Sequence, residues 1–303
     1  SVGDAFGEQF FRLPWEAIVR RELPPPPWNW TDDTAMALSI VEVLRDHRAI
    51  EQDVLAARFA ERFRQDPRRG YGGGAVHLLS QVAEGANWEA EAPRLFNGGL
   101  YGNGAAMRAG PIGGFFWGDP ERAAQEAQRS AVVTHSHSEG QAGAIAVATA
   151  AALAPFKLAL SSVDFLSQVI ARLPQTRTRE KIEEARKIGP DEHGRAVSTL
   201  GTGAELAAFD TVPFCLWVAA HHGFDFETAL WSTVAGGRPR HDLRDRRQHR
   251  GPVGGHSGNL AARSRARSGR VRAGPVILSQ GGSGRIGLRS RPRCNPTAHR
   301  ARH

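Results

Sequence analysis

Hydrophobic residues in the first 237 positions recur at three- and four-residue steps, which is the pattern of helices with one buried face. The clearest case starts at Thr31 and runs to about residue 46. Met36, Ile40 and Leu44 share one face of this predicted helix. Thr31 precedes it as a good N-cap, because a threonine hydroxyl can accept a hydrogen bond from an amide of the first turn.

Further segments carry the same spacing, and no stretch alternates with a two-residue period. The predicted helices span residues 54–63, 142–153, 163–173, 179–188, 212–221 and 226–234. Segment 142–153 consists almost entirely of small and apolar residues, so this helix should be buried on all sides. The sequence therefore predicts an all-α fold, a compact helical bundle.

Charge divides the chain into two parts. Residues 238–303 contain 17 Arg, no Lys and 2 Asp, a net charge of +15, and subtraction from the totals of 39 and 31 leaves 22 basic and 29 acidic residues in 1–237. The tail also lacks periodicity and has too few large apolar residues to form a core. We therefore predict a helical domain over 1–237, followed by a disordered basic low-complexity tail over 238–303 with an irregular structure.

Composition also bears on compartment and partners. We expect no apolar run long enough to span a bilayer, and no charged-then-apolar leader precedes Gly3, so a cytoplasmic protein without a membrane partner is predicted. Cys215 and Cys294 form neither a disulfide framework nor a zinc pattern. The basic tail leaves electrostatic binding of nucleic acid as a disfavoured alternative.

The motif Thr31-Asp32-Asp33-Thr34 has two explanations. A helix cap needs only these residue types, because carboxylates in the first turn are stabilised by the helix dipole. Alternatively, the Thr31 hydroxyl and the two carboxylates are hard oxygen ligands suited to Mg²⁺ or Mn²⁺. One helical turn cannot fill an octahedral shell, so a second segment would have to complete such a site.

Glycine-rich connections form the second candidate. Residues 97–104 contain four glycines within Asn-Gly-Gly-Leu-Tyr-Gly-Asn-Gly and lead into an apolar helical start at Ala105. Backbone amides at such a junction can bind phosphate without a basic side chain. A tight turn before a buried helix explains the same residues equally well.

A third candidate is the polar segment 134–139, which directly precedes the apolar helix. His135 and His137 lie at alternate positions and could ligate a metal from an extended segment, but no thiolate or further histidine is nearby. A polar helix cap, with one histidine hydrogen-bonded in a ligand pocket, is the favoured interpretation.

Taken in order, these motifs resemble the ADP-ribosylglycohydrolase family, which includes the dinitrogenase-reductase-activating glycohydrolases. The resemblance spans nearly all of 1–237. The segments that carry it are 3–7 (Gly-Asp-Ala-Phe-Gly), 30–34 (Trp-Thr-Asp-Asp-Thr), 101–108, 134–135, 210–213 (Asp-Thr-Val-Pro) and 229–237.

The resemblance implies an all-α bundle around a site for two divalent ions, Mg²⁺ or Mn²⁺, that cleaves the glycosidic bond joining ADP-ribose to a protein side chain or a small acceptor. An ADP-ribosylated protein or small conjugate would be the partner. The implied metal ligands are Thr31, Asp32 and Asp33, of which the two aspartates are also the implied catalytic residues. The residues implied to bind substrate are Gly102, Asn103, Gly104 and His135.

The chain departs from the family pattern at both ends, so we expect a truncated domain. Family members begin several residues before the Gly-Asp-Ala element, and many carry a glutamate just beyond it, where this chain has Phe10 and Phe11 and offers Glu8 as the nearest substitute. After Gly237 the family continues Asp-x-Asp-Thr, whereas residues 238–243 read Arg-Pro-Arg-His-Asp-Leu.

A single inserted base explains this second departure. Residues 237–244 can be encoded so that removal of one base gives Gly-Asp-Arg-Asp-Thr-Thr-Cys, followed by an apolar helical segment. A frameshift near Gly237 would leave the ion site incomplete and the chain a poor catalyst or none. Loss of the following helix is expected to expose Phe214, Trp217 and Trp231.

Three functions remain open from the sequence. The first is a metal-dependent ADP-ribosyl hydrolase, whose ions orient the ribose hydroxyls and lower the pKa of the attacking water. The second is a non-catalytic ADP-ribose binder, and the third is a nucleic-acid-binding protein that acts through the basic tail.

Overall fold

The computed structural model describes residues 2–11 and 13–237, and the regular elements of this part of the chain are all helices. Its only β contact is an isolated antiparallel bridge between Gly102 and Ala207. The predicted all-α class is confirmed. The predictions for the basic tail and its frameshift fall on 238–303, outside the described residues, and the domain boundary at Gly237 stays a prediction.

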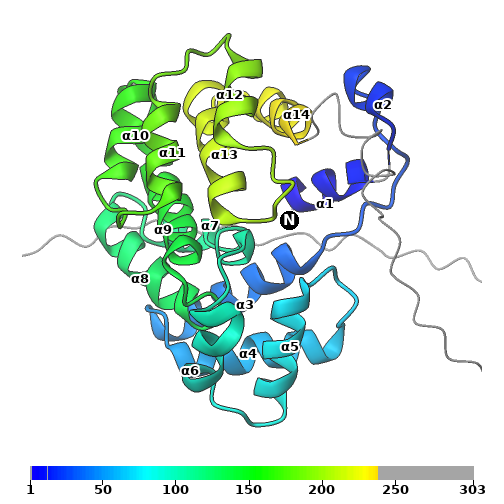
Figure 1. The fold of residues 1–303 in the computed structure, drawn as a ribbon, viewed down its shortest axis with the longest axis vertical. Helices are drawn as coiled ribbons and strands as arrows, with labels where there is room; N and C mark the ends of the chain where they lie inside the picture. Colours follow the sequence, from blue (N-terminus) through cyan, green and yellow to red (C-terminus); the bar gives the residue numbers. More distant parts are fainter. Residues whose placement is uncertain (1, 12, 238–303) are drawn as a thin grey trace, which may run out of the picture. The chain divides into compact units, whose positions relative to one another are not determined.

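The first half of the described chain contains six α-helices and three short 3-10 helices. They are α1 (Val2–Glu8), η1 (Gln9–Phe11), α2 (Trp15–Val19), α3 (Asp32–His47), α4 (Gln52–Gln65), α5 (Gly73–Ala83), α6 (Trp88–Glu91), η2 (Ala92–Asn97) and η3 (Asn103–Ala105). In Figure 1, α3 to α6 occupy the lower part of the view.

The second half contains eight α-helices and one 3-10 helix. They are α7 (Gly110–Phe115), α8 (Pro120–Val132), α9 (Ser138–Leu153), η4 (Ala154–Ala159), α10 (Ser162–Ile170), α11 (Arg177–Ala185), α12 (His193–Leu200), α13 (Ala208–His222) and α14 (Phe226–Gly236). Each helix predicted from periodicity is present, with its ends moved by up to four residues, and Figure 1 shows α10 to α14 grouped in the upper part of the view.

Helix starts follow local chemistry. Thr31 caps α3 by accepting a hydrogen bond from the Asp33 amide at 3.4 Å, as the sequence predicts. His137 caps α9 in the same way, because its Nδ1 accepts from the Glu139 amide at 3.1 Å. The interpretation of the segment 134–139 as a polar helix cap is therefore confirmed for His137.

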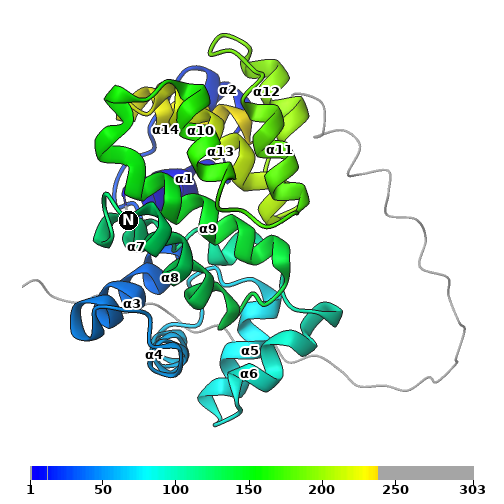
Figure 2. The same ribbon diagram turned by 90° about the vertical axis from the view of Figure 1, so that its left-hand side faces the viewer.

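Helix α9 is the central element of this helical part. It packs against α7, α8, α10 and α13, and Figure 2 shows it running between the surrounding helices. Twelve of its 16 residues are buried, which confirms the prediction of a helix covered on all sides. Gly143 lets the segments that carry Ala106 and Ala208 approach α9 closely, since a Cβ at position 143 would lie 3.0 Å from the Ala208 Cβ and 3.4 Å from the Ala106 Cβ.

The expectation that no apolar run reaches bilayer length is wrong for this same segment. Ser138–Ala159, which joins α9 to η4, is 22 residues long and apolar enough to cross a bilayer by length and composition. Most of it is buried against other helices, and a core helix needs the same apolar composition as a spanning one.

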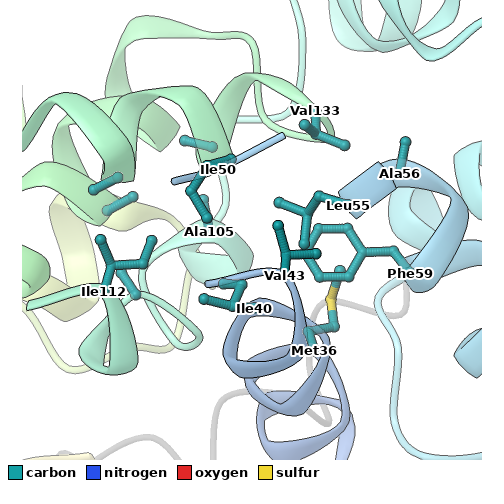
Figure 3. Packing of buried hydrophobic residues seen from close by; sticks show 14 of the residues in the cluster. Met36, Ile40, Val43, Ile50, Leu55, Ala56, Phe59, Ala105, Ile112 and Val133 are labelled. Atoms are coloured by element: carbon teal, nitrogen blue, oxygen red, sulfur yellow. The ribbon is translucent and has the colours of Figure 1, made fainter. Parts of the chain in front are cut away.

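One large hydrophobic cluster lies where α3, α4 and α7 meet. In Figure 3, Met36 of α3 points toward Phe59 of α4, with Leu55 beside that ring, and Ile40 of α3 lies on the side of Ile112 of α7. All five side chains are buried. The predicted apolar face of α3 is thus the face that meets the rest of the core.

A second cluster joins α9 to α10–α13, and a smaller third one joins α1, η1 and α2 to α14. The expected exposure of Phe214, Trp217 and Trp231 is wrong, because all three side chains are buried. Trp231 packs edge-on against Phe6 and Phe10 at ring distances of 5.1 and 5.3 Å. Aromatic contacts from α1 and η1 therefore cover Trp231.

The close contact between α7 and α9 generates a stability prediction. A Cβ on Gly113 would lie within 2.8 Å of three α9 atoms, among them the backbone nitrogen of Ala152, so Gly113→Ala should lower the free energy of unfolding by about 1–3 kcal/mol. Gly114 in the same helix has nothing within 4 Å of such a Cβ, so Gly114→Ala is the matched control, with a change of at most about 1 kcal/mol. Urea unfolding of both variants measures the difference, and equal stabilities would contradict the described packing.

Candidate active site

One cavity of about 720 Å³ contains every site residue predicted from the sequence. Its walls come from α1, from the N-terminus of α3, from the glycine-rich segment through η3, and from the connection between α8 and α9. The predicted residues that line it are Thr31, Asp32, Asp33, Gly102, Asn103, Gly104 and His135. The structure thus brings the three separate motifs together, while the role of each residue stays a prediction.

Asp4 of α1 holds the acidic end of the cavity in place. Its carboxylate accepts hydrogen bonds from the amide and hydroxyl of Thr31, at 2.8 and 2.7 Å. It also accepts from the amide and hydroxyl of Thr34, at 3.2 and 2.6 Å. Because amides at a helix start otherwise lack partners, this one side chain ties α1 to the first turn of α3.

Asp32 and Asp33 are acidic groups in an unfavourable electrostatic environment. Burial, opposed by hydrogen bonds and aided by the charge of Asp4, raises the pKa of Asp32 to about 6. Burial, together with the charges of Asp32 and Asp4, raises the pKa of Asp33 to about 7. No ion pair within 4 Å in 2–11 or 13–237 involves any of these three carboxylates, so no directly contacting cation there offsets their mutual repulsion.

This donor set fits one side of a divalent-cation site. Two carboxylates and a hydroxyl at one helix end are hard oxygen donors, and a bound cation would relieve the repulsion that raises their pKa values. Within the described part of the chain, however, no group of three or more His, Cys, Asp or Glu residues is arranged to hold a metal ion. The carboxylate of Asp4 is already occupied by four hydrogen bonds.

The glycine-rich turn forms another part of the cavity wall. The Asn103 amide donates to the Leu206 carbonyl at 2.9 Å, and the Asn103 side-chain amide donates to the Thr211 hydroxyl at 3.2 Å. The turn is therefore fixed to the segment that precedes α13, from which Leu206 and Glu205 also line the cavity.

His135 lies against this turn. A Cβ on Gly104 would sit 2.8 Å from both Cε1 and Nε2 of the imidazole, so only glycine allows this contact. The ring is buried, and burial together with the charge of Arg108 lowers the pKa of His135 to about 3. His135 is therefore a neutral imidazole at physiological pH.

Glu8, which the sequence offers as a substitute for the family glutamate, and Arg108, to which the sequence assigns no role, also belong to this region. Glu8, near the acidic end, also lines the cavity, and the charge of Glu8 contributes to the raised pKa of Asp32. Arg108 is fully buried and makes a hydrogen bond to Thr134, next to His135. Asp4 and Arg108 stand within the matched motifs 3–7 and 101–108, but their hydrogen bonds join residues more than 20 positions apart, which sequence spacing does not reveal.

Together, fold and cavity define a class of all-α proteins in which an acidic helix end and a glycine-rich turn line one ligand-sized cavity. The family model for ADP-ribosylglycohydrolase matches residues 1–240, and the chain belongs to this family. The family resemblance drawn from the motifs is therefore confirmed.

Relatives agree with this assignment. The ADP-ribosylhydrolase ARH3 of Homo sapiens is 32% identical over 212 residues, and that of Gallus gallus is 34% identical over 210 residues. Each alignment covers 62% of this chain and 57% of the relative, so the chain spans little more than half the length of these proteins. An uncharacterised protein of Archaeoglobus fulgidus is 29% identical, with 78% and 79% of the two chains covered.

Solved structures support the fold. The chain of an ADP-ribosylglycohydrolase-related protein complex superposes with a TM-score of 0.55 at 23% identity, covering 78% of this chain and 77% of that one. This likeness supports the all-α architecture, and the family assignment rests on the sequence match.

The raised carboxylate pKa values predict how pH acts on the metal-free protein. The ionised form of Asp33 is disfavoured in the fold, so its contribution is favourable below its ordinary value of 3.8 and is lost as pH rises toward about 7. With a chelator present, Asp33→Asn should become progressively more stable than wild type over this range. Urea unfolding at several pH values measures this difference.

The matched control is Asp191→Asn, which removes an exposed carboxylate that does not line the cavity. Parallel pH profiles for wild type and Asp33→Asn would contradict the electrostatic description of the acidic end.

Proposed function

We propose that the chain derives from a hydrolase that cleaves the glycosidic bond between ADP-ribose and a protein side chain or small acceptor. Membership of the ADP-ribosylglycohydrolase family supports the reaction class. The observation that carries the proposal is the single cavity in which Asp32 and Asp33 meet the glycine-rich turn and His135. Glycosidic hydrolysis needs charge stabilisation at the ribose and a fixed binding site for the rest of the ligand, and these residues supply one of each.

Two parts of the cavity suggest two separate roles, ion binding and ligand binding. Thr31, Asp32 and Asp33 would hold Mg²⁺ or Mn²⁺, which supplies charge stabilisation and lowers the pKa of water. The glycine-rich turn lets the ligand approach the backbone closely, as a diphosphate requires. Tyr101 and Phe96, half-exposed and exposed at the same cavity, offer aromatic faces for a purine ring.

A second candidate function is binding of ADP-ribose without hydrolysis. It is favoured by one specific observation: the Asp-x-Asp-Thr element is absent after Gly237, where the sequence reads Arg-Pro-Arg. Among the described residues, those that line the cavity all precede position 207, so none of this described lining comes from that element. The chain as written can therefore retain recognition after losing catalysis.

Comparison of two chains separates these functions. One is the chain as written, and the other restores Gly-Asp-Arg-Asp-Thr-Thr-Cys from Gly237 with the reading frame that follows. Calorimetry should detect ADP-ribose binding by both, whereas hydrolysis of an ADP-ribosylated substrate with Mg²⁺ or Mn²⁺ should rise strongly only in the restored chain. Equal hydrolysis by the two would show that the missing ion ligands come from elsewhere.

Substitution of the acidic residues should then remove hydrolysis in the restored chain. Asp32→Ala and Asp33→Ala are each expected to lower turnover by at least about 100-fold, because each removes a carboxylate that holds an ion. A helix cap alone would cost only about 1 kcal/mol of stability and leave turnover intact. Asp191→Ala in the restored chain serves as the control for loss of an acidic side chain. If both site variants kept the turnover of the restored chain, the assignment would be refuted.

A further inference from the structure

The buried connection between α8 and α9 carries a hydrogen-bond chain that ends at the cavity. Arg108 is completely buried, and its guanidinium lies over the Phe59 ring at 4.4 Å. Its Nη2 donates to the Ser130 carbonyl at 3.0 Å and to the Thr134 hydroxyl at 2.8 Å. The Thr134 hydroxyl in turn lies 2.8 Å from Nδ1 of His135.

The available donors and acceptors fix the direction in which this series of hydrogen bonds runs. A guanidinium has donors and no acceptor, so the Thr134 oxygen must accept from Arg108. The single hydroxyl proton of Thr134 then needs an acceptor of its own, and the described residues offer it none except Nδ1 of His135. The reverse arrangement, with a proton on Nδ1, would leave the Thr134 hydroxyl proton unsatisfied in a buried place.

The other ring nitrogen of His135 faces the cavity. Nε2 has no hydrogen-bond partner among the described residues, and it lies on the side of Gly104 and Gly102. The backbone of His135 is fixed as well, since its amide donates a hydrogen bond to the Ala131 carbonyl at 2.7 Å. The position of the imidazole is therefore set before any ligand arrives.

We propose that Arg108 and Thr134 are positioning residues that lock His135 as the neutral imidazole with its proton on Nε2, so that His135 serves as a fixed hydrogen-bond donor to an oxygen of the bound ligand. This assignment rests on the proposed function only for the identity of the ligand, ADP-ribose. It excludes His135 as the general base, because the unprotonated nitrogen already accepts the Thr134 proton and faces away from the cavity.

Charge around the ring favours the same state. Arg108 is the charged group that acts on His135, and its positive field opposes a second proton on the imidazole. Burial lowers the pKa of Arg108 to about 9, and the charge of Asp32 opposes this shift. The guanidinium therefore remains charged at neutral pH. The hydrogen-bond chain thus keeps its direction across the physiological range.

Nitrogen NMR of the full chain labelled with ¹⁵N-histidine tests the tautomer directly, with the His135→Gln variant used to assign the His135 signals. Wild-type protein should show an unprotonated Nδ1 and a protonated Nε2 for His135, unchanged from about pH 6 to about pH 8. A proton on Nδ1, a mixture of tautomers, or a charged ring in this range would overturn the inference.

Three substitutions test whether Thr134 sets the state. Thr134→Val removes the hydroxyl at nearly constant volume, so the His135 tautomers should mix and ADP-ribose affinity should fall on the order of tenfold. Thr134→Ser keeps the hydroxyl and should restore the wild-type spectrum and affinity. Thr149→Val is the matched control, because Thr149 is completely buried in α9 and its hydroxyl has no hydrogen-bond partner among the described residues.

The outcomes separate this inference from the proposed function. A pure Nε2-protonated ring that persists in Thr134→Val would refute the role of Thr134, whatever the ligand. Absence of ADP-ribose binding by wild type, together with the predicted spectra of wild type and Thr134→Val, would refute the proposed ligand and support the locked donor. If Thr134→Val does not fold, the wild-type spectrum and the Thr134→Ser variant still decide.

Discussion

Close approach of backbone to helix α9 is the constraint on which the rest of this structure depends. A Cβ on Gly140 would lie 2.8 Å from the Leu100 carbonyl oxygen, and one on Gly143 would meet Ala106 and Ala208. Larger side chains at these positions would push the glycine-rich turn and α13 away from the helix. The apolar face that stabilises the core and the wall that shapes the cavity are therefore two sides of one packing requirement.

Opposite charges serve the same cavity from two directions. Asp4, Asp32 and Asp33 collect negative charge at the end of α3, while the buried Arg108 lies behind His135 and attracts Asp32. In the part of the chain that the structure describes, neither the three aspartates nor Arg108 forms an ion pair. The charge of Asp4 raises the pKa of Asp32, and the charge of Arg108 lowers the pKa of His135. Unpaired buried charges cost stability. Such an arrangement suits the binding of a cation by the carboxylates and of an acceptor-rich ligand near Arg108 and His135.

Local features of the site were predictable from the sequence. The cap at Thr31, the carboxylates after it and the turn around Gly104 follow from residue types and short spacings. The bonds of Asp4 to Thr31 and of Arg108 to Thr134 did not follow, because they depend on tertiary packing between distant segments. The burial of Trp231 was mispredicted for the same reason, since its cover comes from α1 and η1 at the other end of the described chain.

Paramagnetic relaxation offers the most direct test of the central claim that the acidic helix end and the glycine-rich turn act on one ligand in one cavity. The measurement is the relaxation of the ADP-ribose phosphorus signals in the presence of the full chain and Mn²⁺. We predict strong enhancement with wild type and its loss in Asp32→Asn and Asp33→Asn, with ADP-ribose still bound. Equal enhancement in all three proteins, or none in wild type although ADP-ribose binds, would contradict the account.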